Sequence, residues 1–216
     1  MAVAREALSF EDAIARMARA ERTETLMARH ELARSVAAQI AHGHLSLEAV
    51  LARRRFAQMR TTDRARTSMV VGAHLGLAQV GGARPTGVAL AVGPYDITMR
   101  WEGGGEGIVR KMDIKYVHDA GELRRVRKAT RTDKARAADP PEVPTKPQHR
   151  YPLKDQRLFD AFAAEEEVGV WFVDGELLRG RVTWFSRFEF GMTLKNDAPI
   201  GVLRHAVRGF SAASEL

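Results

Sequence analysis

Two turns near the C-terminal end of the chain hold aromatic and cationic side chains that cannot serve a core. The first is Ser186-Arg187-Phe188, and the second carries the pair Arg204-His205. An aromatic ring can stack on a nucleobase, and a guanidinium can contact phosphates or base edges. The position of these residues at turns of a strand-rich segment therefore calls for an explanation other than core packing.

The sequence offers no comparable set of residues for catalysis. The absence of cysteine excludes disulfides, thiol catalysis, zinc ribbons and iron–sulfur clusters. We find no serine nucleophile elbow, no carboxylate pair at a defined spacing and no metal-ligand cluster, since His42 and His44 have no evident third ligand. We therefore expect a protein that is not an enzyme and that carries no cofactor or metal.

Charge and hydropathy agree with a nucleic-acid partner. Lys and Arg total 34 against 27 Asp and Glu, which gives a net charge of +7 and a pI near 10.1. Such a basic excess favours a nucleic acid or an acidic surface as partner. The N-terminus has no apolar signal-peptide region, and no stretch approaches the ~18 apolar residues of a membrane span. We expect a soluble cytoplasmic protein.

The positions of these residues depend on four expected segments. Apolar residues recur at helical spacing over 1–60, which predicts an N-terminal helical region. Short strand-like runs fill 61–118 and 151–212. Between them, 119–150 is basic, rich in proline and poor in large apolar residues, which predicts a flexible linker.

The two strand-rich segments align with each other at a constant offset of 93 residues. Gly82 falls on Gly175 and Gly87 on Gly180. The first pair suits a tight hairpin turn, where a positive φ is needed, and the second suits a sharp bend inside a strand. Further coincidences at the same offset are Val80 with Val173, Gly76 with Gly169, Met99 with Met192, Tyr95 with Phe188, and Lys111 with Arg204. The sequence thus predicts two copies of one small barrel.

Three motifs of the second copy occur in the order typical of one family. They are FVDGELLRGRV (172–182), the run Phe185-Ser186-Arg187-Phe188, and LRHAV (203–207). Over about residues 150–210 the chain resembles the Hfq branch of the Sm-like RNA-binding proteins, and the first copy is connected to it only through the repeat. The resemblance implies a mainly β fold with α, consisting of two Sm-like (SH3-like, five-stranded and bent) barrels and an N-terminal α-helical region.

The resemblance also implies roles for individual residues. Phe188 would be the base-stacking platform, with Phe190 as the alternative, and Trp171 could stack on the opposite face. The residues expected at the pore of a ring are Arg187, Arg204 and His205, with Lys154 at the start of the preceding helix and Tyr95 and Lys111 as the equivalents in the first copy.

The function implied is that of an Hfq-like RNA chaperone or post-transcriptional regulator, which would bind single-stranded, U-rich RNA. Barrels of this family pair edge to edge into rings, so three chains with two barrels each would make a six-barrel ring. Two other functions stay open. The barrels could be a scaffold in a larger ribonucleoprotein or transcription complex, or the basic helix expected at 47–60 could bind DNA.

Overall fold

The computed structural model describes residues 10–62, 67–133, 135, 137–138 and 142–215. The chain divides into two compact units, with the boundary between residues 58 and 59. The first unit contains α1 (Phe10–His30), α2 (Arg34–Ala41) and most of α3 (Leu47–Thr62), whose residues from Met59 onward belong to the second unit, and α1 and α2 share a small apolar core. None of the described helices is both long enough and apolar enough to cross a membrane.

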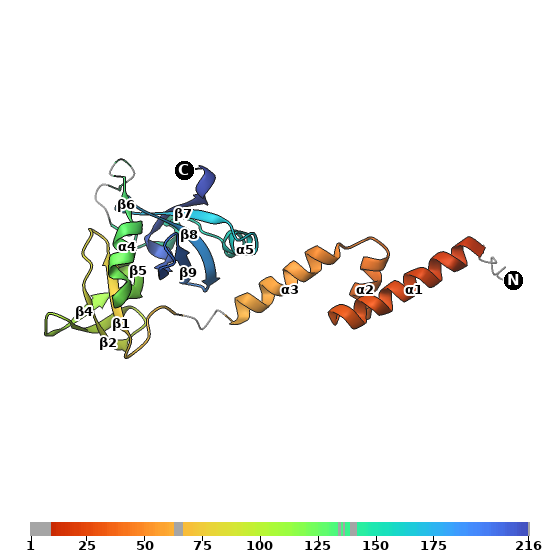
Figure 1. The fold of residues 1–216 in the computed structure, drawn as a ribbon, viewed down its shortest axis with the longest axis horizontal. Coiled ribbons are helices and arrows are strands. Elements are labelled where there is room, and N and C mark those ends of the chain that lie inside the picture. Colours follow the sequence, from red (N-terminus) through yellow and green to blue (C-terminus); the bar gives the residue numbers. More distant parts are fainter. Residues whose placement is uncertain (1–9, 63–66, 134, 136, 139–141, 216) are drawn as a thin grey trace. The chain divides into compact units, whose positions relative to one another are not determined.

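The second unit contains two sets of five strands (Figure 1). The first set is β1 (His74–Gln79), β2 (Thr86–Val92), β3 (Asp96–Trp101), β4 (Glu106–Arg110) and β5 (Ile114–Asp119). The second set is β7 (Glu167–Phe172), β8 (Glu176–Phe185), β9 (Glu189–Leu194), β10 (Pro199–Leu203) and β11 (Val207–Ala212). Helix α4 (Leu123–Ala129) and strand β6 (Arg131–Thr132) follow the first set, and α5 (Asp155–Ala163) precedes the second.

All described strands form one open antiparallel sheet, with the order β11-β7-β8-β9-β10-β5-β1-β2-β3-β4 and with β6 paired to β8. The fold is therefore mixed α and β. In both sets the fifth strand lies beside the first, and the second, third and fourth follow in order. The sequence predicts two separate barrels joined by a linker, whereas here the two sets share one continuous sheet.

The offset of 93 residues relates the two sets strand by strand. Gly87 pairs with Trp101 between β2 and β3, and Gly180 pairs with Leu194 between β8 and β9. The register of β2 shifts between residues 89 and 91, and that of β8 between residues 182 and 184. The other pairings within the sets obey the same offset. The two sets are thus copies of one structural repeat.

Glycine is required at the same two places in each repeat. Gly82 and Gly175 occupy the turn after the first strand, with φ angles of 93° and 79°, where other residues would be strained. Gly87 and Gly180 lie in the second strand, and a Cβ there would overlap a carbonyl oxygen of the third strand. The positive φ angles confirm the predicted turns, and at Gly87 and Gly180 the missing side chain permits the close approach of the third strand.

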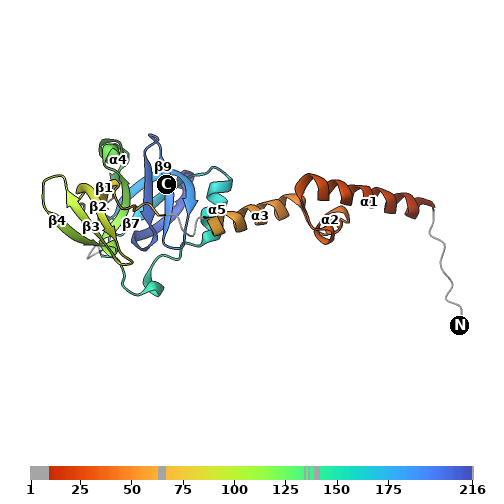
Figure 2. The same cartoon turned by 90° about the horizontal axis from the view of Figure 1, so that it is seen from below.

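The repeats are joined by an edge-to-edge pairing of β10 with β5. Ile200, Gly201 and Val202 of β10 lie opposite residues 118, 117 and 116 of β5. The fourth strand of one repeat therefore continues the sheet at the fifth strand of the other. We call this pairing the internal joint. Helix α5 lies on the side of the second repeat that faces away from β1–β4 in both views (Figures 1 and 2).

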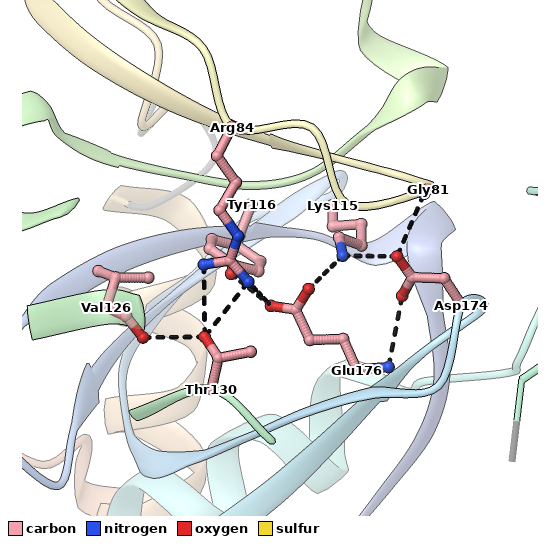
Figure 3. A network of polar contacts seen from close by, with 8 residues as sticks. All are labelled: Gly81, Arg84, Lys115, Tyr116, Val126, Thr130, Asp174 and Glu176. Atoms are coloured by element: carbon pink, nitrogen blue, oxygen red, sulfur yellow. Dashed lines mark hydrogen bonds and ion pairs between the residues drawn. The ribbon is translucent and has the colours of Figure 1, made fainter. Parts of the chain in front are cut away.

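A buried polar cluster crosses the internal joint (Figure 3). Glu176, at the start of β8, accepts hydrogen bonds from Lys115 and Tyr116 of β5 and from Arg84 at 3.0 Å. Lys115 has no exposed side-chain surface and also donates to Asp174 at 2.6 Å. Two cations of the first repeat thus balance two carboxylates of the second.

Part of the segment expected to be a flexible linker is ordered structure. Val126 of α4 is completely buried, and Arg131 and Thr132 of β6 pair with β8. The hydroxyl of Thr130 lies 3.4 Å from the guanidinium of Arg84, which ties the end of α4 to the cluster at the joint. The expectation of flexibility over residues 119–150 is therefore wrong for 120–132. A segment that packs against an existing sheet needs few apolar residues of its own to become ordered.

Candidate nucleic-acid interface

An aromatic side chain projects from the turn between the second and third strands of each repeat. The turns are closed by the same backbone hydrogen bond, from Gly93 to Asp96 at 3.0 Å and from Ser186 to Glu189 at 2.7 Å. In these tight turns the residues Tyr95 and Phe188 have exposed fractions of 82% and 68%. Such large apolar rings in water are platforms on which a planar base can stack.

A cation follows the fourth strand beside each aromatic residue. The amide of Lys111 donates to the carbonyl of Tyr95 at 2.8 Å, and the amide of Arg204 donates to that of Phe188 at 2.9 Å. Both cations begin a 3₁₀ turn, Lys111–Asp113 and Arg204–Ala206. The fold therefore brings together pairs of residues that are 16 positions apart in the sequence, at equivalent places in the two repeats.

The second repeat has a richer cationic environment. The guanidinium of Arg187 lies 5.1 Å from the centre of the Phe188 ring. Arg204 donates to Asp155 at 2.7 Å, and Arg60 lies 3.5 Å from the same carboxylate. These four charged residues line a cavity of about 360 Å³. We call this arrangement, together with Phe188, the platform site.

Arg204 keeps unused hydrogen-bonding capacity in the platform site. Its side chain is 14% exposed, and its Nε and Nη2 atoms have no partner within the described part of the chain. Unpaired buried donors are costly, and a phosphate or carbonyl oxygen entering the cavity would satisfy them. Asp155, which holds Nη1, fixes the direction in which the guanidinium presents these donors.

The remaining residues expected at the interface lie in different environments. Lys154 is exposed at the residue before α5, next to Asp155. Phe190 has no exposed surface and packs edge-on against Phe210, so it cannot be the stacking platform. Trp171 is 9% exposed, which leaves too little ring surface for a base. The sequence does not resolve these cases, because the residue type alone does not show that Phe188 lies in the turn before β9 and Phe190 inside that strand.

His205 lies at the internal joint. Its Nε2 is 3.1 Å from the carbonyl oxygen of Ile114, which belongs to the first repeat. Burial, assisted by the nearby charge of Arg150, lowers the pKa of His205 to about 4. The ring is therefore neutral at pH 7, and its contact with Ile114 makes it a structural element between the repeats.

We expect acid to destabilise the protein in part through His205. In the unfolded chain the imidazole has a pKa near 6.5, so between about pH 6.5 and pH 4 the unfolded state binds a proton that the folded state does not. The stability contributed by the neutral ring is complete above about pH 6.5 and is lost as the pH falls toward 4, by up to about 3 kcal/mol.

The variant His205→Met tests this, because Met112 occupies the equivalent position in the first repeat. Urea unfolding at pH 7.5 and pH 5, values chosen on either side of roughly pH 6.5, should show a smaller loss of stability in the variant than in the native protein. His118 remains in both proteins, and its own lowered pKa contributes equally to both. Equal losses in the two proteins would contradict the assignment.

Sequence reasoning missed Asp155 and Arg60. Asp155 begins the helix before the second repeat, and only the fold brings it to a residue 49 positions later. Among the described residues no group of three or more His, Asp or Glu could hold a metal ion. No protein-family model matches the chain, and no curated protein is significantly similar to it.

Proposed function

We propose that the chain is an Sm-like RNA-binding protein that stacks bases of single-stranded, U-rich RNA on Phe188 and Tyr95. The observation that carries the proposal is the repeated pair of an exposed aromatic and an adjacent cation, Phe188 with Arg204 and Tyr95 with Lys111. Stacking tolerates different bases, and the arginines of the platform site add phosphate contacts. A role as an RNA chaperone or post-transcriptional regulator would follow.

The strand arrangement supports the family part of this proposal. The resemblance implies five-stranded units, preceded by a short helix, that associate edge to edge. Each repeat has five strands with the fifth beside the first, α5 precedes the second repeat, and β10 pairs with β5 across the internal joint. The internal joint is thus the kind of contact through which such units would assemble.

The same joint supports an assembly of several chains. The sheet ends at β4 on one side and at β11 on the other, and these are the fourth and fifth strands of their repeats. We propose that β4 of one chain pairs with β11 of the next, with Gly107, Ile108 and Val109 opposite residues 211, 210 and 209, the register of the internal joint displaced by 93. Three chains would close a ring of six repeats.

Removal of the platform ring should weaken RNA binding. Phe188→Ala is expected to raise the dissociation constant for oligo-U by roughly 5- to 150-fold, since stacking contributes about 1–3 kcal/mol per base. Phe10→Ala removes another ring, 81% exposed on α1, and serves as the control. Fluorescence anisotropy measures both. If the two variants bind oligo-U like the native protein, the platform assignment is wrong.

A comparison of ligands at two salt concentrations separates this proposal from its alternatives. The native protein should bind oligo-U more tightly than oligo-A or duplex DNA, and Arg187→Ala combined with Arg204→Ala should reduce the salt slope by about 1.4, near 0.7 for each lost phosphate contact. A preference for duplex DNA would favour the alternative that the protein binds DNA through the exposed arginines of α3. The absence of binding to all three ligands would favour a protein scaffold.

A further inference from the structure

A second cationic cavity lies on the second unit where α4, β6 and β8 meet the turn after β9. Its volume is about 310 Å³, and no acidic residue lines it. Four cations do so, Lys128 from α4, Arg131 from β6, Arg179 from β8 and Lys195 from the turn, together with Asn196. The cavity is separate from the platform site, because the two share no lining residue.

Several contacts hold these elements in place around the cavity. β6 adds to the edge of β8 through the pairing of Arg131 with Leu177. The side-chain amide of Asn196 donates to the carbonyl of Arg125 at 2.7 Å, and Arg125 in turn donates to the carbonyl of Asn196. These two hydrogen bonds connect α4 to the turn after β9, and they hold the elements that carry the four cations in place relative to one another.

The positive charge of the cavity is poorly compensated. Lys195 pairs with Glu167 at 3.0 Å. Lys128, Arg131 and Arg179 make no ion pair with another described residue, and the Nε of Arg179 is buried without a hydrogen-bond partner there. Like charges that line one cavity repel one another. An anion placed among them would relieve this repulsion and would accept a hydrogen bond from the free Nε of Arg179.

The basic surface continues from the cavity along α4. Arg124, Arg127 and Lys128 are exposed and occupy positions i, i+3 and i+4, so they form one strip on the helix. The C-terminus of α4 carries a partial negative charge, which Arg127 and Lys128 in the last turn offset. The cavity therefore lies at one end of a strip of positive charge on α4.

We infer that this cavity binds a terminal phosphate group, carried by a nucleotide or by the end of an RNA strand. A phosphate at a chain end carries more charge than a bridging phosphate and offers three acceptor oxygens, which suits four converging cations. The volume accommodates the phosphate and part of the attached sugar, and the strip on α4 would attract the following phosphates. The inference does not require the platform site.

The test compares two oligo-U strands of equal length, one phosphorylated at both ends and one at neither. The native protein should bind the phosphorylated strand about tenfold more tightly or better, the effect of one net charge-assisted hydrogen bond. In Lys128→Gln combined with Arg131→Gln this preference should disappear. Both side chains are exposed, so the fold should persist, and thermal unfolding would verify it.

Arg16→Gln combined with Arg19→Gln is the matched control, since it removes the same charge from exposed positions of α1. It should keep the preference. Equal binding of the two strands by the native protein, or a preference that survives in the cavity variant, would overturn the inference. Competition with uridine monophosphate identifies the source: displacement of the phosphorylated strand at low concentration assigns the site to nucleotides, and its absence assigns it to strand ends.

Failure of the phosphate site and failure of the proposed stacking function would give different results. Phe188→Ala should weaken both strands by the same factor and leave their ratio unchanged. If Phe188→Ala has no effect while the preference for the phosphorylated strand remains, the stacking proposal fails and the phosphate site stands.

Discussion

Glu176→Ala is expected to lower the free energy of unfolding by about 3–5 kcal/mol, the cost typical of removing one partner of a buried ion pair. For a chain of 216 residues this corresponds to a fall of roughly 6–20 °C in melting temperature. Urea and thermal unfolding followed by circular dichroism would measure both quantities.

The size of this effect follows from what Glu176 leaves behind. Lys115 is fully buried and would keep only Asp174 as a counter-charge. Arg84 would lose its carboxylate partner, and Tyr116, whose pKa burial raises, would lose the acceptor of its hydroxyl proton. A buried charge or donor without a partner costs far more than the net stabilisation that its pair contributed.

Two further variants decide whether burial is the cause. Glu106→Ala breaks an ion pair with Arg100 in which both side chains are more than half exposed, and it should cost less than about 1 kcal/mol. Replacing both Lys115 and Glu176 by Met should recover part of the stability lost in Glu176→Ala, because the fully buried ammonium group is removed, while Arg84 and Asp174, which lose their partners, keep some contact with water. Equal effects of Glu176→Ala and Glu106→Ala would show that the cluster does not hold the joint.

The polar cluster also distinguishes the internal joint from the joint proposed between chains. At an offset of 93, Lys115 corresponds to Arg208 and Glu176 to Ala83, so the cluster has no counterpart at β4 and β11. A contact that needs paired buried charges rejects partners that lack them. The cluster therefore favours pairing between the two repeats of one chain at the internal joint. A contact between chains would depend on backbone pairing and apolar packing alone.

Periodicity explains why the repeat could be predicted from the sequence. Matched glycines fix the same turn and the same close approach of strands in both copies, so one offset determines the registers. The sequence also predicts Phe188 as the stacking ring, with Phe190 as the alternative. The choice between Phe188 and Phe190 required the structure, because Phe188 lies in the turn before β9, whereas Phe190 lies in that strand and packs against Phe210.

Other features depend on contacts between distant residues, which composition does not reveal. Lys115 and Glu176 meet across 61 positions, and His205 meets Ile114 across 91. Helix α4 has a single fully buried side chain, Val126, and its charged sequence resembles that of a linker. In these examples a contact with a distant part of the chain gives a residue or segment a role that its local sequence does not indicate.

Ile108→Lys is expected to convert the proposed trimer into monomers. Ile108 is 72% exposed on β4, and a lysine on an edge strand opposes further strand pairing without disturbing the core. Native mass spectrometry should show a mass near 72 kDa for three native chains and 24.0 kDa for the variant. Ile14→Lys, at an isoleucine 53% exposed on α1, controls for the loss of an exposed apolar side chain.

Mixing two edge variants tests the direction of the proposed assembly. A chain with Ile108→Lys keeps an intact β11, and a chain with Ser211→Lys keeps an intact β4, since residue 211 lies opposite residue 107 in the register carried over from the internal joint. Each alone should be monomeric, whereas an equimolar mixture should form a dimer of about 48 kDa, twice the chain mass, and no larger species. Head-to-tail pairing requires this result, because only one competent joint exists in the mixture. A native protein that is monomeric, or a mixture that remains monomeric, would contradict the proposed ring, while the stacking proposed at Phe188 and Tyr95 would be unaffected.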